Sequence, residues 1–283
     1  MNTVEGYKLG WRRDFADVRD YQLDHPIVQP FLLKSALFGD ADAAAIIDKY
    51  DITQQYDSPR IKDQQSIGSC TANAGAFMFE TYVCVSGQED VPLSRIFLYK
   101  VARNLLREAG DVGCFLRTTM QALATFGVPP EGFCPYDTKL FDEEPRAFLY
   151  AMAQNDKALT YYRLDPPGIA LPTVVDSMKV NLAANRALVL GFTVYSNMGN
   201  SGDVALPGVF SRVQGGHAIC LVGYDDAYRI GDSVGAFKFA NSWTAGWGHA
   251  GYGFLPYDFI LKGLASDVWA MMSASWLQLD CFR

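Results

Sequence analysis

The sequence contains few residues of the kinds that bind transition metals. Its 283 residues include three histidines and six cysteines, and no two cysteines are spaced as C-x-x-C. Zinc sites usually combine such a pair with a second pair of cysteine or histidine ligands. Six cysteines are also sparse for a disulfide scaffold of this length. We therefore expect no metal site, no cofactor and mostly reduced thiols, with Cys114 and Cys134 as the one pair considered for a bridge.

The sequence also lacks basic runs and long apolar runs. The formal net charge is −7 and the isoelectric point is near 5.0, which argues against a nucleic acid or an anionic membrane as partner. The longest apolar stretches, such as residues 187–192, are too short to span a bilayer. The N-terminal stretch MNTVEGYKLGWRRDF has no apolar signal-peptide region. We expect a protein without a membrane segment that is cytoplasmic or exported by a non-classical route, and the sequence does not decide between these locations.

The residue pattern changes along the chain, without internal repeats. Residues 1–55 form a polar N-terminal segment, either a strap or a removable pro-segment, with an apolar stretch PFLLKSALF and an expected short helix in DADAAAIIDKY. Residues 56–165 carry helical patterns, and residues 166–283 carry short strand patterns separated by turn residues. This order predicts an α+β protein whose helical lobe and β-rich lobe face each other across a cleft, a favoured place for ligand sites.

The individual elements can be expected from periodicity and from glycine, proline and asparagine positions. The buried face of the first helix follows the i, i+4, i+7 pattern from Cys70 onward. Expected helices cover residues 70–85, 94–106, 118–127 and 173–186, and expected strands cover residues 187–195, 208–212, 217–225, 236–243, 251–257 and 268–273.

One thiol lies at a junction between a loop and a helix. Cys70 ends the stretch QQSIGSC and begins the helical pattern, and unpaired N–H groups at a helix N-terminus favour a thiolate. A catalytic cysteine also needs a base. His25 lies in the N-terminal segment and His249 in the glycine-rich loop GWGHAGYG, whereas His217 opens the strand pattern GGHAICLVGYDD. His217 is therefore the histidine best placed to reach a cleft.

Three separated motifs in this order resemble the signatures of papain-like cysteine peptidases. QQSIGSC (residues 64–70) resembles the Gln-Gly-x-Cys-Gly-Ser-Cys signature, GGHAICLVGYD (215–225) the strand with the histidine, and NSWTAGWGHAGYGFLP (241–256) the block with the asparagine. GSCTANA, GVPPEGFCPYD and GWRRDFADVRD are similar to bacterial and viral members in particular. The resemblance implies a papain-like fold, with a helical left lobe, an antiparallel β-barrel-like right lobe and the active site between them.

The resemblance also implies a role for each motif residue. Cys70 is expected to be the nucleophile, and His217 its ion-pair partner, which later protonates the leaving amine. Asn241 is expected to orient the imidazole, and Trp243 to shield that bond from water. Gln64 is expected to supply a side-chain N–H to the oxyanion hole, next to the backbone N–H of Cys70.

The implied function is that of a cysteine endopeptidase that hydrolyses protein or peptide substrates through a thioester. Because family members are commonly made as zymogens, we expect the N-terminal segment to contact the cleft, with residues 30–50 as its cover and GWRRDFADVRD packed against the body. Two alternatives stay open: a catalytically inactive papain-fold binding protein, and a Cys–His acyltransferase or amidase.

The sequence departs from the papain signature near each motif. Thr71 stands in place of a tryptophan, Ile67 of a cysteine, Thr244 of a glycine and Gly216 of a frequent aspartate. Gly110 and Gly113 are candidates for the glycines that dock a substrate backbone. The substrate and its preferred side chains do not follow from these motifs.

Overall fold

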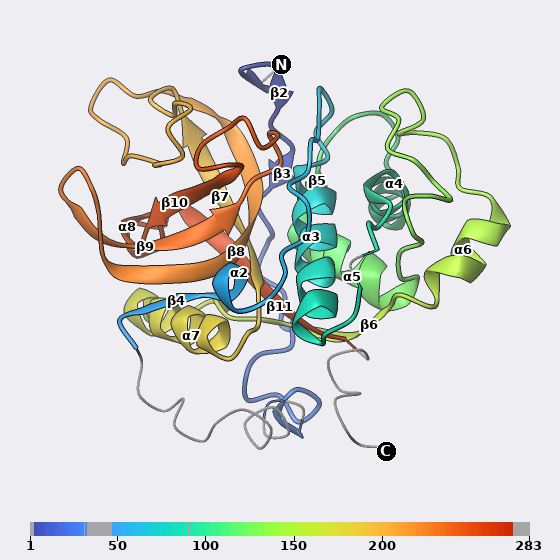
Figure 1. The fold of residues 1–283 in the computed structure, drawn as a ribbon, viewed down its shortest axis with the longest axis horizontal. Helices are drawn as coiled ribbons and strands as arrows, with labels where there is room; N and C mark the ends of the chain where they lie inside the picture. The colour runs from blue at the N-terminus through green and yellow to red at the C-terminus, as the bar shows by residue number, and fades with distance from the viewer. Residues whose placement is uncertain (1–2, 31, 33–46, 90, 274–283) are drawn as a thin grey trace.

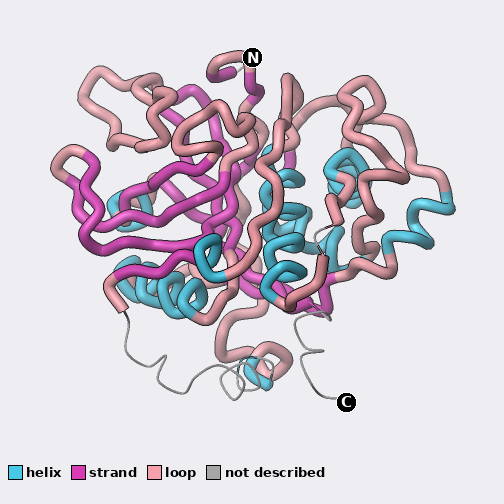
Figure 2. Tube along the Cα trace, viewed as in Figure 1, coloured by secondary structure: helices cyan, strands magenta, loops and turns pink. Residues whose placement is uncertain are grey.

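Helices and strands are segregated to two sides of the molecule. The computed structural model describes residues 3–30, 32, 47–89 and 91–273. Helices gather on one side and a large antiparallel sheet on the other (Figures 1 and 2). This arrangement confirms the expected α+β class with two lobes.

Helix α3 (Cys70–Val85) runs through the middle of the molecule, where the two sides meet (Figure 1). All of its residues except Val83 are buried, and its alanines keep it slim enough to pack on every side. Helices α4 (Arg95–Leu106) and α5 (Leu116–Thr125) pack against it, and α6 (Ala147–Ala153) lies at the outer edge. The N-terminus of α3 is therefore held at the boundary between the lobes.

The sheet has seven strands in the order β10-β9-β8-β7-β11-β6, with β4 also paired to β8. The strands are β4 (Lys49–Asp51), β6 (Ala158–Arg163), β7 (Leu188–Tyr195), β8 (Val213–Ile230), β9 (Ser233–Ala240), β10 (Tyr252–Pro256) and β11 (Ala265–Ser273). Helix α7 (Leu171–Ala183) and the short helices α2 (Ile52–Gln55) and α8 (Asp258–Leu261) complete this side. Strands β4 and β6 come from outside residues 166–283, to which we assign the β-rich lobe.

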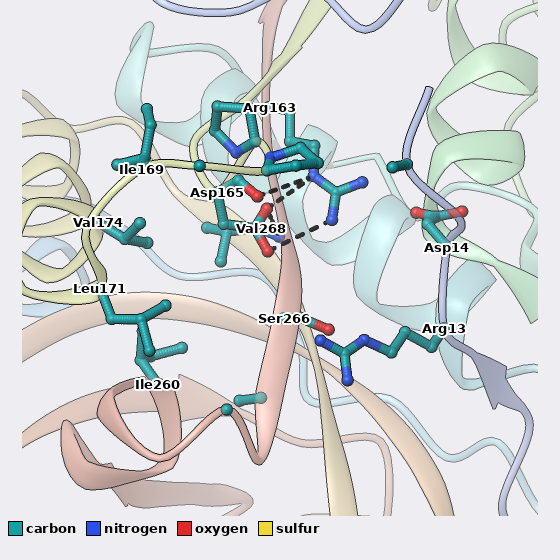
Figure 3. Close-up of a pocket in the computed structure, with 16 residues that line it drawn as sticks. Arg13, Asp14, Arg163, Asp165, Ile169, Leu171, Val174, Ile260, Ser266 and Val268 are labelled. Carbon is teal, nitrogen blue, oxygen red and sulfur yellow. Dashed lines mark hydrogen bonds and ion pairs between the residues drawn. The ribbon is translucent and has the colours of Figure 1, made fainter. Parts of the chain in front are cut away.

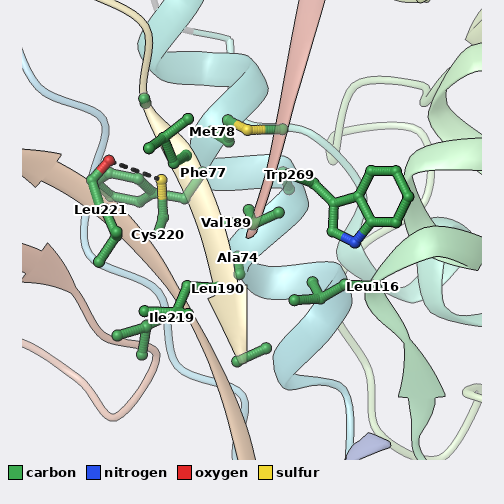
Figure 4. Packing of buried hydrophobic residues seen from close by; sticks show 14 of the residues in the cluster. Ala74, Phe77, Met78, Leu116, Val189, Leu190, Ile219, Cys220, Leu221 and Trp269 are labelled. Carbon is green, nitrogen blue, oxygen red and sulfur yellow. Dashed lines mark hydrogen bonds between the residues drawn. The ribbon is translucent and has the colours of Figure 1, made fainter. Parts of the chain in front are cut away.

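The core fixes α3 to the sheet. Phe77 and Met78 of α3 lie against side chains of β7 and β8, including Leu190 and Ile219 (Figure 4). These residues are buried. Because each fully buried large apolar side chain contributes about 1.5–3 kcal/mol, this packing sets the position of α3 relative to β8.

The N-terminal segment forms two small sheets between the lobes. Strand β1 (Thr3–Val4) pairs with β2 (Tyr7–Lys8), and β3 (Trp11–Arg12) runs parallel to β5 (Cys114–Phe115). In Figure 1, β2 lies near the N-terminus at the top of the molecule, and β3 lies below it, near the upper end of α3.

Most expected elements are present, with differences in the less regular parts. The four expected helices correspond to α3, α4, α5 and α7. The strand expected at residues 208–212 is wrong: Gly208 N–H bonds to the Ser211 hydroxyl at 3.0 Å and closes a turn there. Strand β6 and helix α6 are not among the expected elements. Residues 33–46, with most of the apolar stretch and the expected helix of the N-terminal segment, lie outside the described residues, while Lys49 and Tyr50 belong to β4.

Candidate active site

Cys70 and His217 are placed by the two elements that the core joins. Cys70 is the first residue of α3, and His217 lies in β8. The backbone groups of Ala218 and Gly10 lie close enough to the Cys70 thiol to lower its pKa, so the nucleophile candidate lies against the strand that carries the histidine. Both side chains are fully buried.

Burial disfavours charge on both groups. It raises the pKa of Cys70 to about 11, although backbone hydrogen bonds oppose the change. It lowers the pKa of His217 to about 4, opposed by the hydrogen bond with Asn241. In this enclosed state a neutral thiol beside a neutral imidazole is therefore preferred over the ion pair expected from the motifs.

Asn241 and Trp243 fix the imidazole. Asn241 Oδ1 lies 2.8 Å from His217 Nε2, and the Trp243 ring stacks on the imidazole with centroids 4.7 Å apart. Trp243 is buried. With Nε2 occupied, Nδ1 is left without a hydrogen-bond partner among the described residues, and it is the ring nitrogen free to exchange a proton.

The hydrogen bonds of Gln64 fix the orientation of its side-chain amide. Its side-chain oxygen accepts a hydrogen bond from the Ser242 hydroxyl at 2.7 Å, so its NH₂ group points the other way. That group donates to the carbonyl of Lys8 at 2.8 Å and to the carbonyl of Ile67 at 3.1 Å. The side chain is fully buried. Gln64 thus holds a peptide carbonyl of the N-terminal segment.

Residues 7–12 occupy the cleft. Tyr7 stacks on Trp243 with centroids 5.4 Å apart, and the Gly10 carbonyl accepts a hydrogen bond from the backbone N–H of Cys114 at 2.9 Å. Lys8 Nζ donates to the Asp111 carboxylate at 2.7 Å. GWRRDFADVRD is expected to pack against the body, and Asp14 and Trp11 do bond to Asp267. Its first residues, Gly10 and Trp11, also lie against Gly68 and Gly216 beside the motif residues. The cover expected from residues 30–50 lies largely outside the described residues.

The position of Trp11 explains why a glycine, Gly216, stands before the histidine where many relatives have an aspartate. A Cβ built on Gly216 would lie 2.5 Å from the Trp11 carbonyl oxygen and 2.6 Å from its ring. The N-terminal segment therefore takes the space that a side chain at Gly216 would need. Thr244, which replaces another family glycine, adopts a left-handed backbone with φ 65°, a conformation that glycine adopts more readily.

Beyond the cleft, buried acids anchor the segment. The Asp14 backbone N–H and the Trp11 indole donate to one oxygen of Asp267, at 2.7 and 3.1 Å, while Arg163 donates to its other oxygen at 2.8 Å. Burial raises the pKa of Asp267, and of Asp14 beside it. Arg163 and Asp165 also line a cavity of about 310 Å³ next to Asp14 (Figure 3). The segment is thus joined to β11 on the far side of the cleft.

The other histidines and cysteines of the described residues lie elsewhere. His25 stacks on Tyr21, and His249 is exposed, with Asp203 3.4 Å away. Cys220 is buried in the core (Figure 4), and Cys114 and Cys134 are free thiols. Within the described ranges, no group of three potential ligands could hold a metal ion, and no helix is both long and apolar enough to cross a membrane.

Motif reasoning missed the residues of the segment that contact the site. No motif includes Lys8 or Asp111. Gly10 and Trp11 begin the stretch GWRRDFADVRD, to which the resemblance gives no role in the site. The available signal was the Gly10–Trp11 pair, a flexible residue beside a large aromatic in an otherwise polar stretch.

Comparison with protein families gives one assignment. The sequence model of the papain family cysteine proteases matches residues 46–266. A peptidase C1-like protein of Acanthamoeba polyphaga mimivirus is 29% identical over 224 residues, which cover 75% of this chain and 70% of the viral protein. Cathepsin B-like CP2 of Giardia intestinalis is 26% identical over 270 residues, covering 87% of this chain and 82% of the relative.

Solved structures show the same architecture. Xylellain, a cysteine protease from Xylella fastidiosa, is 28% identical with a TM-score of 0.77, and the match covers 97% of this chain and 99% of xylellain. Procathepsin B of Trypanosoma congolense has a TM-score of 0.68 at 16% identity, with 94% of this chain and 86% of that chain covered, and supports the fold alone.

Proposed function

The chain belongs to the papain family of cysteine proteases and is a cysteine peptidase, and on this premise we propose that it is an endopeptidase held latent by its own residues 7–12. The observation that carries the proposal is the hydrogen bond from Gln64 Nε2 to the Lys8 carbonyl at 2.8 Å. It places a peptide carbonyl at the donor expected to stabilise the oxyanion, next to the nucleophile candidate.

In the proposed reaction, Cys70 Sγ attacks the carbonyl carbon of a substrate peptide bond while His217 Nδ1 accepts the thiol proton. Gln64 Nε2 and the backbone N–H of Cys70 stabilise the negative charge on the carbonyl oxygen. The proton passes from His217 to the leaving amine as the C–N bond breaks, which leaves a thioester. Water then attacks the thioester carbonyl carbon while His217 accepts a proton from it. The C–S bond breaks and releases the carboxylic acid, and the proton on His217 returns to Cys70 Sγ or stays to form the ion pair. Asn241 keeps the imidazole oriented throughout.

The proposed latency follows because residues 7–12 exclude substrate and water from the site. A substrate carbonyl cannot reach Gln64 Nε2 while the Lys8 carbonyl occupies it. The same segment buries the Cys70 thiol and the His217 ring, so that both neutral forms are preferred. Displacement or removal of residues 7–12 admits water and substrate together, and the ion pair then becomes the favoured state of the two groups.

The test uses the full-length chain carrying Gly10→Ala, whose added Cβ would clash with the Gly68 backbone and so displaces the segment. Cys70→Ala and Cys220→Ala are each introduced into this chain. We expect hydrolysis of fluorogenic peptides and iodoacetamide labelling of position 70, mapped by mass spectrometry, in the Gly10→Ala chain and in the same chain with Cys220→Ala, but not in the chain with Cys70→Ala. The control removes a thiol that is equally buried but lies in the core. Equal activity of the two variants contradicts the assignment of the nucleophile.

The same preparation distinguishes the alternative functions. Labelling of Cys70 without cleavage of any peptide, even after the segment is displaced, favours a binding protein. Products joined to an added amine, detected by mass spectrometry, favour acyl transfer over hydrolysis.

A further inference from the structure

The Asp111 carboxylate is held rigidly beside the nucleophile helix. Its Oδ1 accepts hydrogen bonds from the Gly68 backbone N–H at 2.9 Å and from the Tyr99 hydroxyl at 2.7 Å. Gly68 lies two residues before Cys70. These two donors leave Oδ2 directed to the cleft, where Lys8 Nζ bonds to it at 2.7 Å. The Lys8 and Asp111 side chains are only 18% and 16% exposed, so the pair is largely shielded from solvent.

Lys8 stands in the place of a substrate residue. Its carbonyl is the one bound by Gln64 Nε2, and in the proposed reaction that donor binds the carbonyl under attack. From this position its side chain reaches Asp111. We propose that Asp111 determines specificity, and that the enzyme cleaves after lysine or arginine because Asp111 binds the cationic side chain of the residue whose carbonyl is attacked. The inference rests on the peptidase function proposed above.

The charges around Asp111 support a cationic substrate. The neighbouring cations Arg103 and Lys100 both pair with Asp142, at 2.7 and 3.5 Å. When Lys8 leaves, the carboxylate therefore keeps its two neutral donors and loses its cation. The Asp111 carboxylate then carries a negative charge with no cation beside it, and it attracts a lysine or arginine side chain more strongly than a neutral one.

A second acid of the same loop binds a second basic residue of the segment. Glu108 Oε2 lies 2.5 Å from Arg12 Nη1, and the Arg12 guanidinium lies 4.3 Å from the centre of the Phe115 ring. This pair is about one-third exposed and is therefore weaker than the pair at Asp111. Its presence indicates that the loop as a whole faces basic peptides.

The experiment compares Asp111 with Asp111→Asn in the full-length chain carrying Lys8→Ala, which removes the competing cation, and Gly10→Ala, whose added Cβ clashes with the Gly68 backbone and displaces the segment. The asparagine keeps an oxygen for Gly68 and Tyr99 while it removes the charge. Peptide substrates differ only at the attacked residue, which is lysine, arginine, glutamine or glutamate. We expect kcat/KM for lysine and arginine to exceed that for glutamine by about 10- to 100-fold, in line with a hydrogen bond between charged groups. Asp111→Asn should bring this ratio close to one and leave kcat/KM for the glutamine peptide nearly unchanged. Asp176→Asn, an exposed acid of α7, is the matched control.

Two results overturn the inference. If Asp111→Asn raises the turnover of all four peptides equally, the carboxylate serves only to hold the segment. If no peptide is cleaved and Cys70 is not labelled, the peptidase proposal itself fails, and binding then tests Asp111 separately. In that case, fluorescence anisotropy of labelled lysine and glutamine peptides on the chain carrying Cys70→Ala, Lys8→Ala and Gly10→Ala must show tighter binding of the lysine peptide, and Asp111→Asn must abolish this difference. Equal binding of the two peptides refutes a role in specificity.

Discussion

Gly10 is the point at which the N-terminal segment approaches the nucleophile loop most closely. A Cβ built on Gly10 would lie 2.0 Å from the Gly68 carbonyl oxygen and 2.6 Å from Gly68 Cα. Both contacts are with backbone atoms, which no rotamer change can move. Favourable contacts between non-bonded heavy atoms begin near 3.5 Å. Gly10→Ala therefore forces the segment out of its seat by more than about 1 Å.

A shift of that size breaks the bonds on either side of Gly10. These are the Lys8 carbonyl to Gln64 Nε2 at 2.8 Å, the Gly10 carbonyl to the Cys114 N–H at 2.9 Å and the Trp11 indole to Asp267 at 3.1 Å. At about 1 kcal/mol for each bond, the closed state loses roughly 3 kcal/mol relative to the open state. Since 1.4 kcal/mol is a factor of ten, the open fraction should rise by about a hundredfold.

The assay is kcat/KM of the full-length chain on a fluorogenic peptide, with folding followed by the thermal midpoint. We expect activity to rise by up to about a hundredfold in Gly10→Ala, and to stay unchanged in Gly132→Ala, a glycine whose added Cβ meets no atom within 4 Å. Tyr7→Ala, which removes the stacking on Trp243, should open the cleft without a backbone clash. Folded variants with wild-type activity at both positions would falsify the latency argument.

The sequence predicts those parts of the candidate site that lie within continuous motifs. The small residues after Cys70 predict a helix, and α3 begins at that residue. The resemblance of the second and third motifs to the papain signature implies that Asn241 orients the His217 imidazole, and their side chains lie 2.8 Å apart. Each motif is continuous in sequence, so the residue types and their spacing fix most of the local geometry.

The occupied cleft could not be predicted in the same way. It depends on contacts between positions far apart in sequence: Lys8 with Gln64, Lys8 with Asp111, and Trp11 with Asp267. None of these residues is unusual by itself, since a lysine or an aspartate in a polar stretch reads as a solvated charge. Gly216 could be identified as a departure from the family pattern, but its cause becomes visible only with Trp11 packed over it.

Two further predictions concern the base and the protonation of the thiol. In the Gly10→Ala background, His217→Ala should lower kcat/KM by at least about a hundredfold. His249 is exposed and lies on another loop, so His249→Ala should keep most of the activity. Equal losses in the two variants would mean that the wrong histidine is assigned as the base. The last prediction is the pH profile of Cys70 alkylation. Because burial raises the pKa of Cys70 to about 11 in the closed state, the thiolate fraction of the wild type should grow about tenfold per pH unit between pH 6 and 10. In Gly10→Ala, water reaches both side chains and the imidazolium stabilises the thiolate, so alkylation should instead level off at mildly acidic pH, and His217→Ala should remove that plateau. A wild-type protein that already shows the plateau would have an open cleft, and its latency would need another cause.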